Sequence, residues 1–231
     1  GYLGNQNLKE SGIDIKFTEE QVKEYIKCAS DPVYFIEKYI KVVSLDEGLI
    51  PFNLYDYQED MVKKVHNNRF IIAKLPRQSG KSTTMVSYLL HYVLFNQNMN
   101  VAILANKQAV AKDILSRLQL TYEYLPLWLQ QGIVEWNKGS IQLENGSKII
   151  ASSTSASAIR GGSFNIIFLD EFAHVPTNIA EEFFNSVYPT ITAGQETKVL
   201  MVSTPNGLNM FYYYWKGATK KIGEAGKNEY I

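Results

Sequence analysis

Apolar positions divide the chain into two parts. Up to about residue 67 they recur at helical spacing, with a capping-box pattern at Thr18 to Gln21 and a helix boundary at Asp31-Pro32. Beyond residue 67, short apolar runs alternate with longer amphipathic segments. The runs lie at residues 70–75, 101–105, 166–169 and 199–203. Because buried strands separated by helices build a mostly parallel sheet with both faces covered, this pattern predicts an α/β fold.

A β-hairpin is predicted between the second and third of these runs. Ile141 and Leu143 alternate with polar residues, an Asn-Gly turn follows at residues 145–146, and residues 148–151 return as a second strand. The hairpin therefore interrupts the alternation of strands and helices.

Composition bounds the size and the environment of the protein. With 231 residues and 45% hydrophobic content, the chain can bury one sizeable core, so we expect a small helical subdomain at residues 1–52 and a main domain at 53–215. The 23 basic and 23 acidic residues balance, which argues against a DNA-coating protein with a strongly basic surface. Cys28 has no second cysteine to pair with, which favours an intracellular protein. The apolar runs are too short to span a bilayer, so no membrane association is expected.

A phosphate-binding loop is predicted directly after the first apolar run. Lys81 would neutralise the β- and γ-phosphate oxygens of ATP, and the Ser82 hydroxyl would bind Mg²⁺. The residues expected to line the nucleotide are Gln78, Ser79, Gly80, Lys81, Ser82 and Thr83. Leu75 stands where the Walker A pattern has its first glycine, so the strict pattern fails at one position. An ordinary strand-to-helix turn with a capping serine is the alternative interpretation.

An acidic pair ends the third apolar run, as in a Walker B motif. Asp170 would hold Mg²⁺ through water, and Glu171 would act as the general base that polarises the attacking water. A strand tip that merely reaches solvent could also end in two carboxylates. The order of the loop and the acidic pair, with room for a further strand between them, favours a nucleotide hydrolase.

The fourth run ends in Ser203-Thr204, followed by Pro-Asn-Gly. Hydroxyls at a strand end beside the acidic pair can sense the γ-phosphate and transmit its loss to the aromatic segment at residues 211–215. The alternative is a Ser/Thr cap before a turn.

Taken together, these motifs resemble the large terminases of tailed phages, especially those of T4-like phages. The matching segments are Arg77 to Ser82, Leu169 to Glu171, Ser203 to Gly207, Tyr57-Gln58, residues 133–140 and Ile159-Arg160-Gly161. In that family the phosphate loop typically lacks the first glycine of the Walker A pattern. The resemblance covers roughly residues 30 to 215.

The resemblance implies a P-loop NTPase fold of the ASCE or RecA-like type, and an ATP- and Mg²⁺-dependent motor that pumps double-stranded DNA into a procapsid. It implies a pentameric ring at the portal vertex in the host cytoplasm, with the portal protein and the small terminase subunit as partners. It further implies that Tyr57 and Gln58 contact adenine, that Arg77 assists catalysis, and that Ser203-Thr204 is the coupling motif. Residues 216–231 would begin a lid that joins the N-terminal helices. The nuclease domain of large terminases is not expected within these residues.

Two candidates, Arg160 and Tyr57, also have a structural alternative. Arg160 lies in a glycine-rich segment that could reach a neighbouring subunit's nucleotide, but it could equally form a salt bridge or anchor a loop. Tyr57 could be a core residue. The three histidines, His66, His91 and His174, lack the spacing of zinc ligands, so no zinc site is expected.

Two other classes of function share part of this pattern. A superfamily 2 helicase has similar motifs but needs a second RecA-like domain, for which 231 residues leave no room. A nucleotide-dependent assembly protein would bind ATP without turnover, and Glu171 argues against it because a pure switch has no need of an activated water.

Overall fold

The computed structural model describes residues 1–160, 162–192 and 194–231. Its α-helices are α1 (Glu19–Ser30), α2 (Pro32–Tyr39), α3 (Asp56–Asn67), α4 (Lys81–Phe95), α5 (Gln108–Glu123), α6 (Ala156–Ile159), α7 (Thr177–Ser186), α8 (Tyr188–Thr192) and α9 (Met210–Ala218). Its short 3-10 helices are η1 (Tyr2–Gly4), η2 (Leu127–Leu129) and η3 (Phe172–His174). Its strands are β1 (Lys41–Ser44), β2 (Gly48–Pro51), β3 (Phe70–Lys74), β4 (Asn100–Ala105), β5 (Ile133–Trp136), β6 (Ser140–Leu143), β7 (Lys148–Ser153), β8 (Ile166–Asp170) and β9 (Lys198–Ser203). None of the helices in these ranges has the length and apolar character needed to cross a membrane.

The central sheet has the order β3-β9-β8-β4-β7-β6-β5 within the described residues. Neighbours from β3 to β7 pair in parallel, and β6 pairs antiparallel with both β7 and β5. The α/β prediction is confirmed, as are the four predicted strands and the hairpin, which is β6 and β7. The order also places β9, which ends in the predicted coupling residues, between the strand of the phosphate loop and the strand of the acidic pair.

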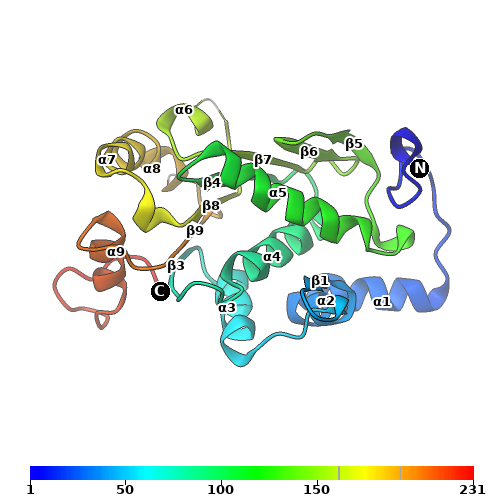
Figure 1. Ribbon diagram of the computed structural model, residues 1–231, viewed down its shortest axis with the longest axis horizontal. Helices are drawn as coiled ribbons and strands as arrows, with labels where there is room; N and C mark the ends of the chain where they lie inside the picture. The colour runs from blue at the N-terminus through cyan, green and yellow to red at the C-terminus, as the bar shows by residue number, and fades with distance from the viewer. Residues whose placement is uncertain (161, 193) are drawn as a thin grey trace.

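Alternate residues of each buried strand enter two different hydrophobic cores. Ile71, Ile103 and Phe168 pack with the helices of the first half of the chain, whereas Ile72 and Leu169 pack with η3, α7 and α9. Side chains of successive strand residues point to opposite faces, so a strand covered on both sides must be apolar throughout. In Figure 1, α7, α8 and α9 lie at the left of the molecule, and α1 to α5 extend from the centre to the right.

The two ends of the chain lie along the two edges of the sheet. The Ile133 amide at the start of β5 donates to the Lys9 carbonyl, and Leu8 beside it is buried. At the opposite edge, the Ile72 amide of β3 donates to the Ile231 carbonyl, and the Ile231 amide donates to the Phe70 carbonyl. Unpaired strand edges invite association with other chains, and these contacts cover part of each edge. Figure 1 shows the two ends well apart.

The N-terminal segment contains the two predicted helices and also a hairpin that the apolar pattern did not predict. Thr18 forms the expected capping box with Gln21. The hairpin consists of β1 and β2, which pair antiparallel from Lys41 opposite Pro51 to Ser44 opposite Gly48. Phe35 and Ile36 of α2 are fully buried in the same core as α4. The segment therefore packs on the main domain rather than standing apart from it.

Residues 216–231 follow α9 and pack at the β3 edge. Tyr230 is fully buried, and its ring lies 5.5 Å from that of Phe70 and 5.4 Å from that of Tyr214. The Asn228 side chain donates to the Tyr214 carbonyl. The assignment of this stretch to a lid stays a prediction.

A buried histidine joins α1 to α4. In α1 the Cys28 carbonyl would accept from the amide four residues later, but that residue is Pro32, which has no N–H. His91 Nε2 lies 2.9 Å from this carbonyl and, since a carbonyl only accepts, Nε2 must carry the hydrogen. Burial is the main cause that lowers the pKa of His91, to about 4. The imidazole is therefore neutral in the folded protein at neutral pH.

We expect acid to destabilise the fold through His91. The unfolded chain binds a proton at this residue below its ordinary pKa of 6.5, but the folded chain does so only below about 4. Between these values the unfolded state binds more protons, so the free energy of unfolding falls as the pH falls, by on the order of 3 kcal/mol over the whole window.

Urea unfolding at pH 7 and pH 5 measures this effect. His91→Gln keeps a neutral donor for the carbonyl and should flatten the pH dependence. His66→Gln is the matched control, because His66 is less buried and its removal should change the slope less. Equal slopes in the wild type and His91→Gln would contradict the assignment.

Candidate nucleotide-binding site

The phosphate loop connects β3 to α4. Leu75 still pairs with β9, because its amide donates to the Ser203 carbonyl, and positive φ angles occur later, at Gln78 (57°) and Gly80 (70°). The backbone at residue 75 is thus an extension of the strand and does not require glycine. This geometry explains why the loop tolerates leucine at the first position of the Walker A pattern. Lys81 follows as the first residue of α4 and is buried.

Tyr57 and Gln58 of α3 hold the loop by a single carbonyl. The Tyr57 hydroxyl donates to the Ser79 carbonyl at 2.6 Å, and Gln58 Nε2 donates to it at 3.1 Å. Gln58 Oε1 accepts from the Tyr55 amide. A Cβ at Gly80 would lie 2.6 Å from Gln58 Nε2, so this close approach also needs glycine. The structure therefore brings both residues to the loop, and adenine contact stays a prediction.

Lys81 and Glu171 form an ion pair across the candidate site. Lys81 Nζ lies 2.8 Å from Glu171 Oε1, and both side chains are largely shielded from solvent. Glu171 has a φ of 50°, in the left-handed region that costs a non-glycine residue on the order of 1–3 kcal/mol. Such a conformation persists only where surrounding contacts hold it, and the ion pair is one of them.

The two carboxylates of the acidic pair have opposite electrostatic environments. Burial, together with the charge of Glu171, raises the pKa of Asp170 to about 6, although the Ser82 hydroxyl donates to Asp170 Oδ1 at 3.1 Å. Burial also acts to raise the pKa of Glu171, but Lys81 and Thr204 outweigh it and lower that pKa below its ordinary value. Glu171 is thus held as a carboxylate, which a general base requires.

Ser82 and Asp170 provide a donor set that fits Mg²⁺. The hydroxyl of the half-buried Ser82 and a carboxylate oxygen of the buried Asp170 lie next to each other, and hard oxygen ligands suit this ion. The described residues contain no cluster of three or more histidine, cysteine or acidic side chains suited to a metal. A magnesium site here would therefore depend on oxygens from the nucleotide and water as well.

Ser203 and Thr204 contact the segment that comes after the acidic pair. Thr204 Oγ1 donates to Glu171 Oε2 at 3.0 Å, and the Thr204 amide lies 3.3 Å from the same oxygen. Ser203 Oγ accepts from the Ala173 amide at 3.0 Å. Both side chains are buried, so the hydroxyls serve the site rather than solvent.

Two asparagines connect this segment to α9. The side chains of Asn206 and Asn209 both donate to the Ala173 carbonyl, at 3.1 and 2.7 Å. Asn209 also caps α9 by accepting from the Tyr212 amide. At the other side of α9, the Lys74 ammonium lies 3.4 Å from the centre of the Trp215 ring. The helix is therefore attached both to the acidic strand end and to the strand that leads into the phosphate loop.

The two arginine candidates are not part of this cluster. Arg77 is exposed and forms no ion pair with the residues that the structure describes. Arg160 is 64% exposed, and its guanidinium lies 3.8 Å from the carboxylate of Glu182, which is 61% exposed. Gly161, the next residue of the predicted motif, lies outside the described residues. An exposed pair at this distance is weak and leaves Arg160 free to exchange partners.

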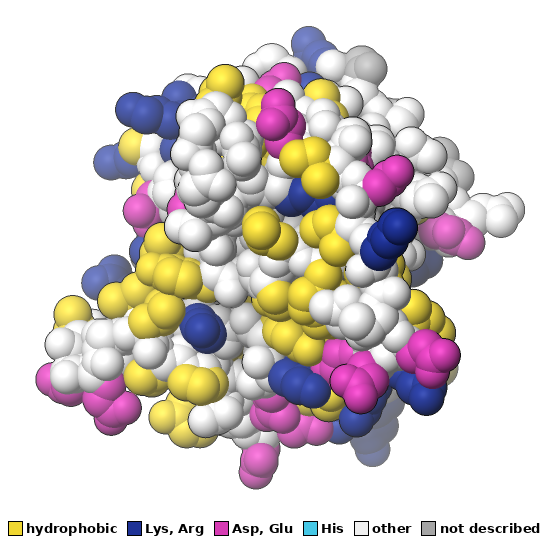
Figure 2. All heavy atoms as spheres, turned by 90° about the vertical axis from the view of Figure 1, so that its right-hand side faces the viewer, with side chains coloured by type: hydrophobic (Ala, Val, Ile, Leu, Met, Phe, Trp, Pro, Cys, Tyr) yellow, Lys and Arg dark blue, Asp and Glu magenta, His cyan; other side chains and the backbone are white. Residues whose placement is uncertain are grey.

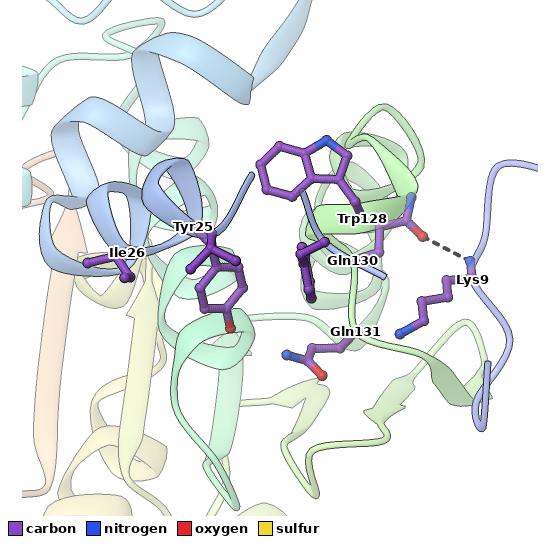
Figure 3. Close-up of a pocket in the computed structure, with 8 residues that line it drawn as sticks. Lys9, Tyr25, Ile26, Trp128, Gln130 and Gln131 are labelled. Carbon is purple, nitrogen blue, oxygen red and sulfur yellow. Dashed lines mark hydrogen bonds between the residues drawn. The ribbon is translucent and has the colours of Figure 1, made fainter. Parts of the chain in front are cut away.

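A separate cavity of about 310 Å³ is lined by residues between positions 9 and 26 and between positions 128 and 131, none of which belongs to the phosphate loop. Figure 2 shows the right-hand side of the molecule in Figure 1, where hydrophobic side chains gather near the middle. Figure 3 shows Lys9, Tyr25, Trp128 and Gln131 arranged around the cavity. Its lining contains none of the predicted nucleotide-site residues. The phosphate loop therefore stays the candidate nucleotide site.

The motifs did not identify the third histidine as a site residue. His174 Nε2 lies 2.8 Å from Thr204 Oγ1 and 3.4 Å from Glu171 Oε2. Zinc-ligand spacing does not identify a residue such as His174. Its position three residues after Glu171, however, indicates that it lies near the acidic pair. The Pro-Asn-Gly pattern predicts only a turn at Asn206, and no predicted motif includes Asn209.

Comparison with known proteins places the chain in a family. A family model described as "Terminase large subunit, T4likevirus-type, N-terminal" matches residues 72–230. The large terminase subunit of Thermus virus P23-45 is 33% identical over 76 residues, which cover 31% of this chain and 15% of that protein. That of Thermus phage G20c is also 33% identical over 76 residues, with the same coverage.

Solved terminase structures share the fold. The HK97 bacteriophage large terminase superposes with a TM-score of 0.71 at 17% identity, over 88% of this chain and 43% of that one. The Thermus phage P74-26 large terminase ATPase domain gives 0.55 at 22% identity, over 78% of each chain. The large terminase of a thermophilic bacteriophage, in complex with ATP-gamma-S, gives 0.56 at 14% identity over 78% of this chain and 44% of that one.

The chain thus spans less than half of the HK97 protein and a much smaller part of the Thermus phage subunits. The family match, however, includes the phosphate loop, the acidic pair and the Ser203-Thr204 strand end, and it extends over more than half of the chain. The chain therefore belongs to the family of T4likevirus-type large terminase subunits, of which it represents the N-terminal region.

Proposed function

We propose that this chain is the ATPase motor domain of a phage large terminase, which hydrolyses ATP to move double-stranded DNA into a procapsid. The observation that carries the proposal is the position of Glu171, whose carboxylate contacts Lys81 of the phosphate loop at one oxygen and Thr204 of the coupling strand at the other. A base, a phosphate-binding cation and a sensor hydroxyl within contact distance are the parts that a hydrolytic motor needs.

ATP binding begins with an exchange of partners at Lys81. The γ- and β-phosphate oxygens would take the ammonium that Glu171 now holds, and the loop amides would surround them. Ser79 Oγ is buried without a hydrogen-bond partner among the described residues, and a phosphate oxygen could supply one. Ser82 and Asp170 would hold Mg²⁺, which neutralises charge on the phosphates.

Release from Lys81 frees Glu171 to act on water. Thr204 still holds Oε2, so Oε1 becomes available to accept the proton of a water aligned with the γ-phosphate. The charge that develops during transfer needs a cation, for which Arg77 from the same subunit and Arg160 from a neighbour are the candidates.

Loss of the γ-phosphate would be transmitted through η3 to α9. Glu171 contacts Thr204, Ser203 holds the Ala173 amide, and Asn206 and Asn209 hold its carbonyl. A shift of the acidic strand end therefore pulls directly on α9. We propose that this helix passes the motion to the parts that grip DNA, in a pentameric ring with the portal protein and the small terminase subunit, at the portal vertex in the host cytoplasm. Nuclease activity would belong to another part of the subunit.

Lys81→Ala and Glu171→Gln should separate binding from turnover. Without Lys81 the chain should lose both nucleotide affinity and hydrolysis. With Glu171→Gln, turnover should fall by about 10² to 10⁴-fold because an amide cannot accept the proton. The affinity of Glu171→Gln for the nucleotide should equal or exceed that of the wild type, because the phosphates no longer have to break an ion pair between Lys81 and Glu171. Calorimetric titration with ATP-gamma-S and a phosphate-release assay measure the two quantities.

The exposed Glu20 provides the control for the second variant, and Glu20→Gln should match the wild type in both assays. Parallel loss of affinity and turnover in Glu171→Gln would make Glu171 a structural or metal-binding residue.

Thr204→Val should uncouple hydrolysis from movement. In the complete large terminase subunit, we expect turnover to fall only about tenfold, through the lost hydrogen bond to Glu171, while the DNA packaged per ATP hydrolysed falls much further. Thr121→Val is the control, because that hydroxyl donates only to the Arg117 carbonyl within α5. A normal ratio of DNA packaged to ATP consumed would return Thr204 to a capping role.

Mixed oligomers should show whether an arginine acts across subunits. Arg160→Ala subunits, inactive alone, should regain hydrolysis when mixed with Glu171→Gln subunits, because some interfaces then pair an intact arginine with an intact base. Arg77→Ala subunits should show no such rescue, since they lack a group that acts on their own nucleotide.

The salt-bridge alternative for Arg160 has its own control. Glu182→Ala removes the partner that Arg160 has in this structure and should leave hydrolysis unchanged if Arg160 works in trans. If Glu182→Ala reproduces the loss seen in Arg160→Ala, or if mixing restores nothing although mixed oligomers form, Arg160 has only a structural role.

A further inference from the structure

The shortest contacts of the Glu171 carboxylate are with Lys81 and Thr204, while Ser203 Oγ and His174 Nε2 lie farther from Oε2, at 3.5 and 3.4 Å. Lys81 holds Oε1 but is the group that phosphate oxygens would take. Thr204 holds Oε2 through its hydroxyl and its amide. Once a nucleotide has taken Lys81, the shortest hydrogen bond left to orient the carboxylate is the one from the Thr204 hydroxyl.

The direction of the Thr204 hydroxyl is set by His174. A carboxylate only accepts, so the hydroxyl hydrogen of Thr204 must point at Glu171 Oε2. A hydroxyl has one hydrogen, and Thr204 Oγ1 is therefore the acceptor in its 2.8 Å contact with His174 Nε2. Nε2 must then carry a hydrogen. If Nε2 lacked one, the hydroxyl could turn to donate to the ring and leave Glu171.

The main chain around His174 is fixed from several sides. The His174 amide donates to the Glu171 carbonyl at 2.9 Å, which closes the turn between the two residues. Ala173 is buried, with its amide bonded to Ser203 and its carbonyl to Asn206 and Asn209. The His174 imidazole thus projects from a constrained turn toward Thr204, and this side chain is 28% exposed.

We propose that His174 is a positioning residue for the general base: its Nε2–H orients the Thr204 hydroxyl, which in turn keeps the Glu171 carboxylate aimed at the attacking water. The inference rests on the proposed function, because it assigns His174 a part in the same hydrolytic site. It adds a residue that would touch neither the nucleotide nor Mg²⁺ and would act mainly through Thr204, because His174 Nε2 lies nearer to Thr204 Oγ1 (2.8 Å) than to Glu171 Oε2 (3.4 Å). It also connects the base and the coupling strand through a side chain from η3.

Two substitutions at this position distinguish orientation from packing. His174→Gln keeps an N–H donor near the position of Nε2, whereas His174→Phe keeps a ring of similar shape without a donor. We expect His174→Phe to lower kcat for ATP about tenfold, with KM within about twofold of the wild type, because the lost hydrogen bond does not touch the substrate. His174→Gln should retain kcat within about threefold.

A double-mutant cycle with Thr204→Val tests the route of the effect. If His174 acts through Thr204, then His174→Phe should lower kcat no further in a Thr204→Val background, since the hydroxyl that it orients is already absent. Thermal unfolding of each variant, followed without nucleotide, shows whether the fold is intact.

The outcomes separate this inference from the proposed function. Turnover by the unmutated chain together with a wild-type kcat in His174→Phe would overturn the inference and leave the proposed function standing. Equal losses in His174→Phe and His174→Gln, or additive losses in the cycle, would also overturn it. Absence of ATP turnover by the unmutated chain, with Mg²⁺ present, would contradict the proposed function and the inference together.

Discussion

The candidate site depends on three parallel strands that end at the same level. Lys74 of β3 is in register with Ser203 of β9, and Asp170 of β8 is in register with Val202 of β9. The phosphate loop, the hydroxyls of Ser203 and Thr204, and the acidic pair each lie where a strand ends, so the sheet alone brings them to one edge. The two apolar cores on either face of the sheet fix this alignment, because shifting one strand by a residue would exchange the side chains that enter the two cores and disrupt the close packing of both.

Around that edge, local strain is held by polar contacts. Gln78 and Glu171 both have left-handed backbone conformations, one in the loop and one after the acidic strand. The loop is tied to α3 through the Ser79 carbonyl, and Glu171 is tied to Lys81 and Thr204. In each case the contact partner comes from a segment distant in sequence. The geometry of the site is therefore a product of tertiary structure rather than of the motifs alone.

The sequence predicted the parts of the fold that have a local signal. Continuous apolar runs identified four of the parallel strands, the Asn-Gly turn identified the β6–β7 hairpin, and Thr18 identified a helix start. Burial, turn geometry and capping each leave a pattern within a few residues. The β1–β2 hairpin left no such pattern, because each of its strands has only 4 residues and none of them is buried.

Contacts between distant segments had no such signal. The loop lysine and the two carboxylates were predicted as site residues, and the structure brings them together. The sequence could not indicate that Lys81 pairs with Glu171. Nor could it indicate that the Gln58 side-chain amide donates to the loop carbonyl of Ser79, or that His174 contacts Thr204. These contacts depend on how α3, η3 and β9 pack together, and the local sequence of one element does not specify which residue of another element it will contact. The same holds for the ends of the chain, whose backbones join the sheet edges.

The ion pair of Lys81 and Glu171 also has a meaning for the end of a catalytic cycle. Before a nucleotide binds, the charge of Lys81 is already matched by the carboxylate of Glu171. The phosphate oxygens of an incoming nucleotide would compete with Glu171 for the Lys81 ammonium. A triphosphate carries more negative charge than a diphosphate and would therefore compete more strongly. If the proposed hydrolysis removes the terminal phosphate, the Lys81–Glu171 pair would form again more readily, and this would favour departure of the product. In the proposed motor, the group that activates water would then also help to empty the site for the next turnover.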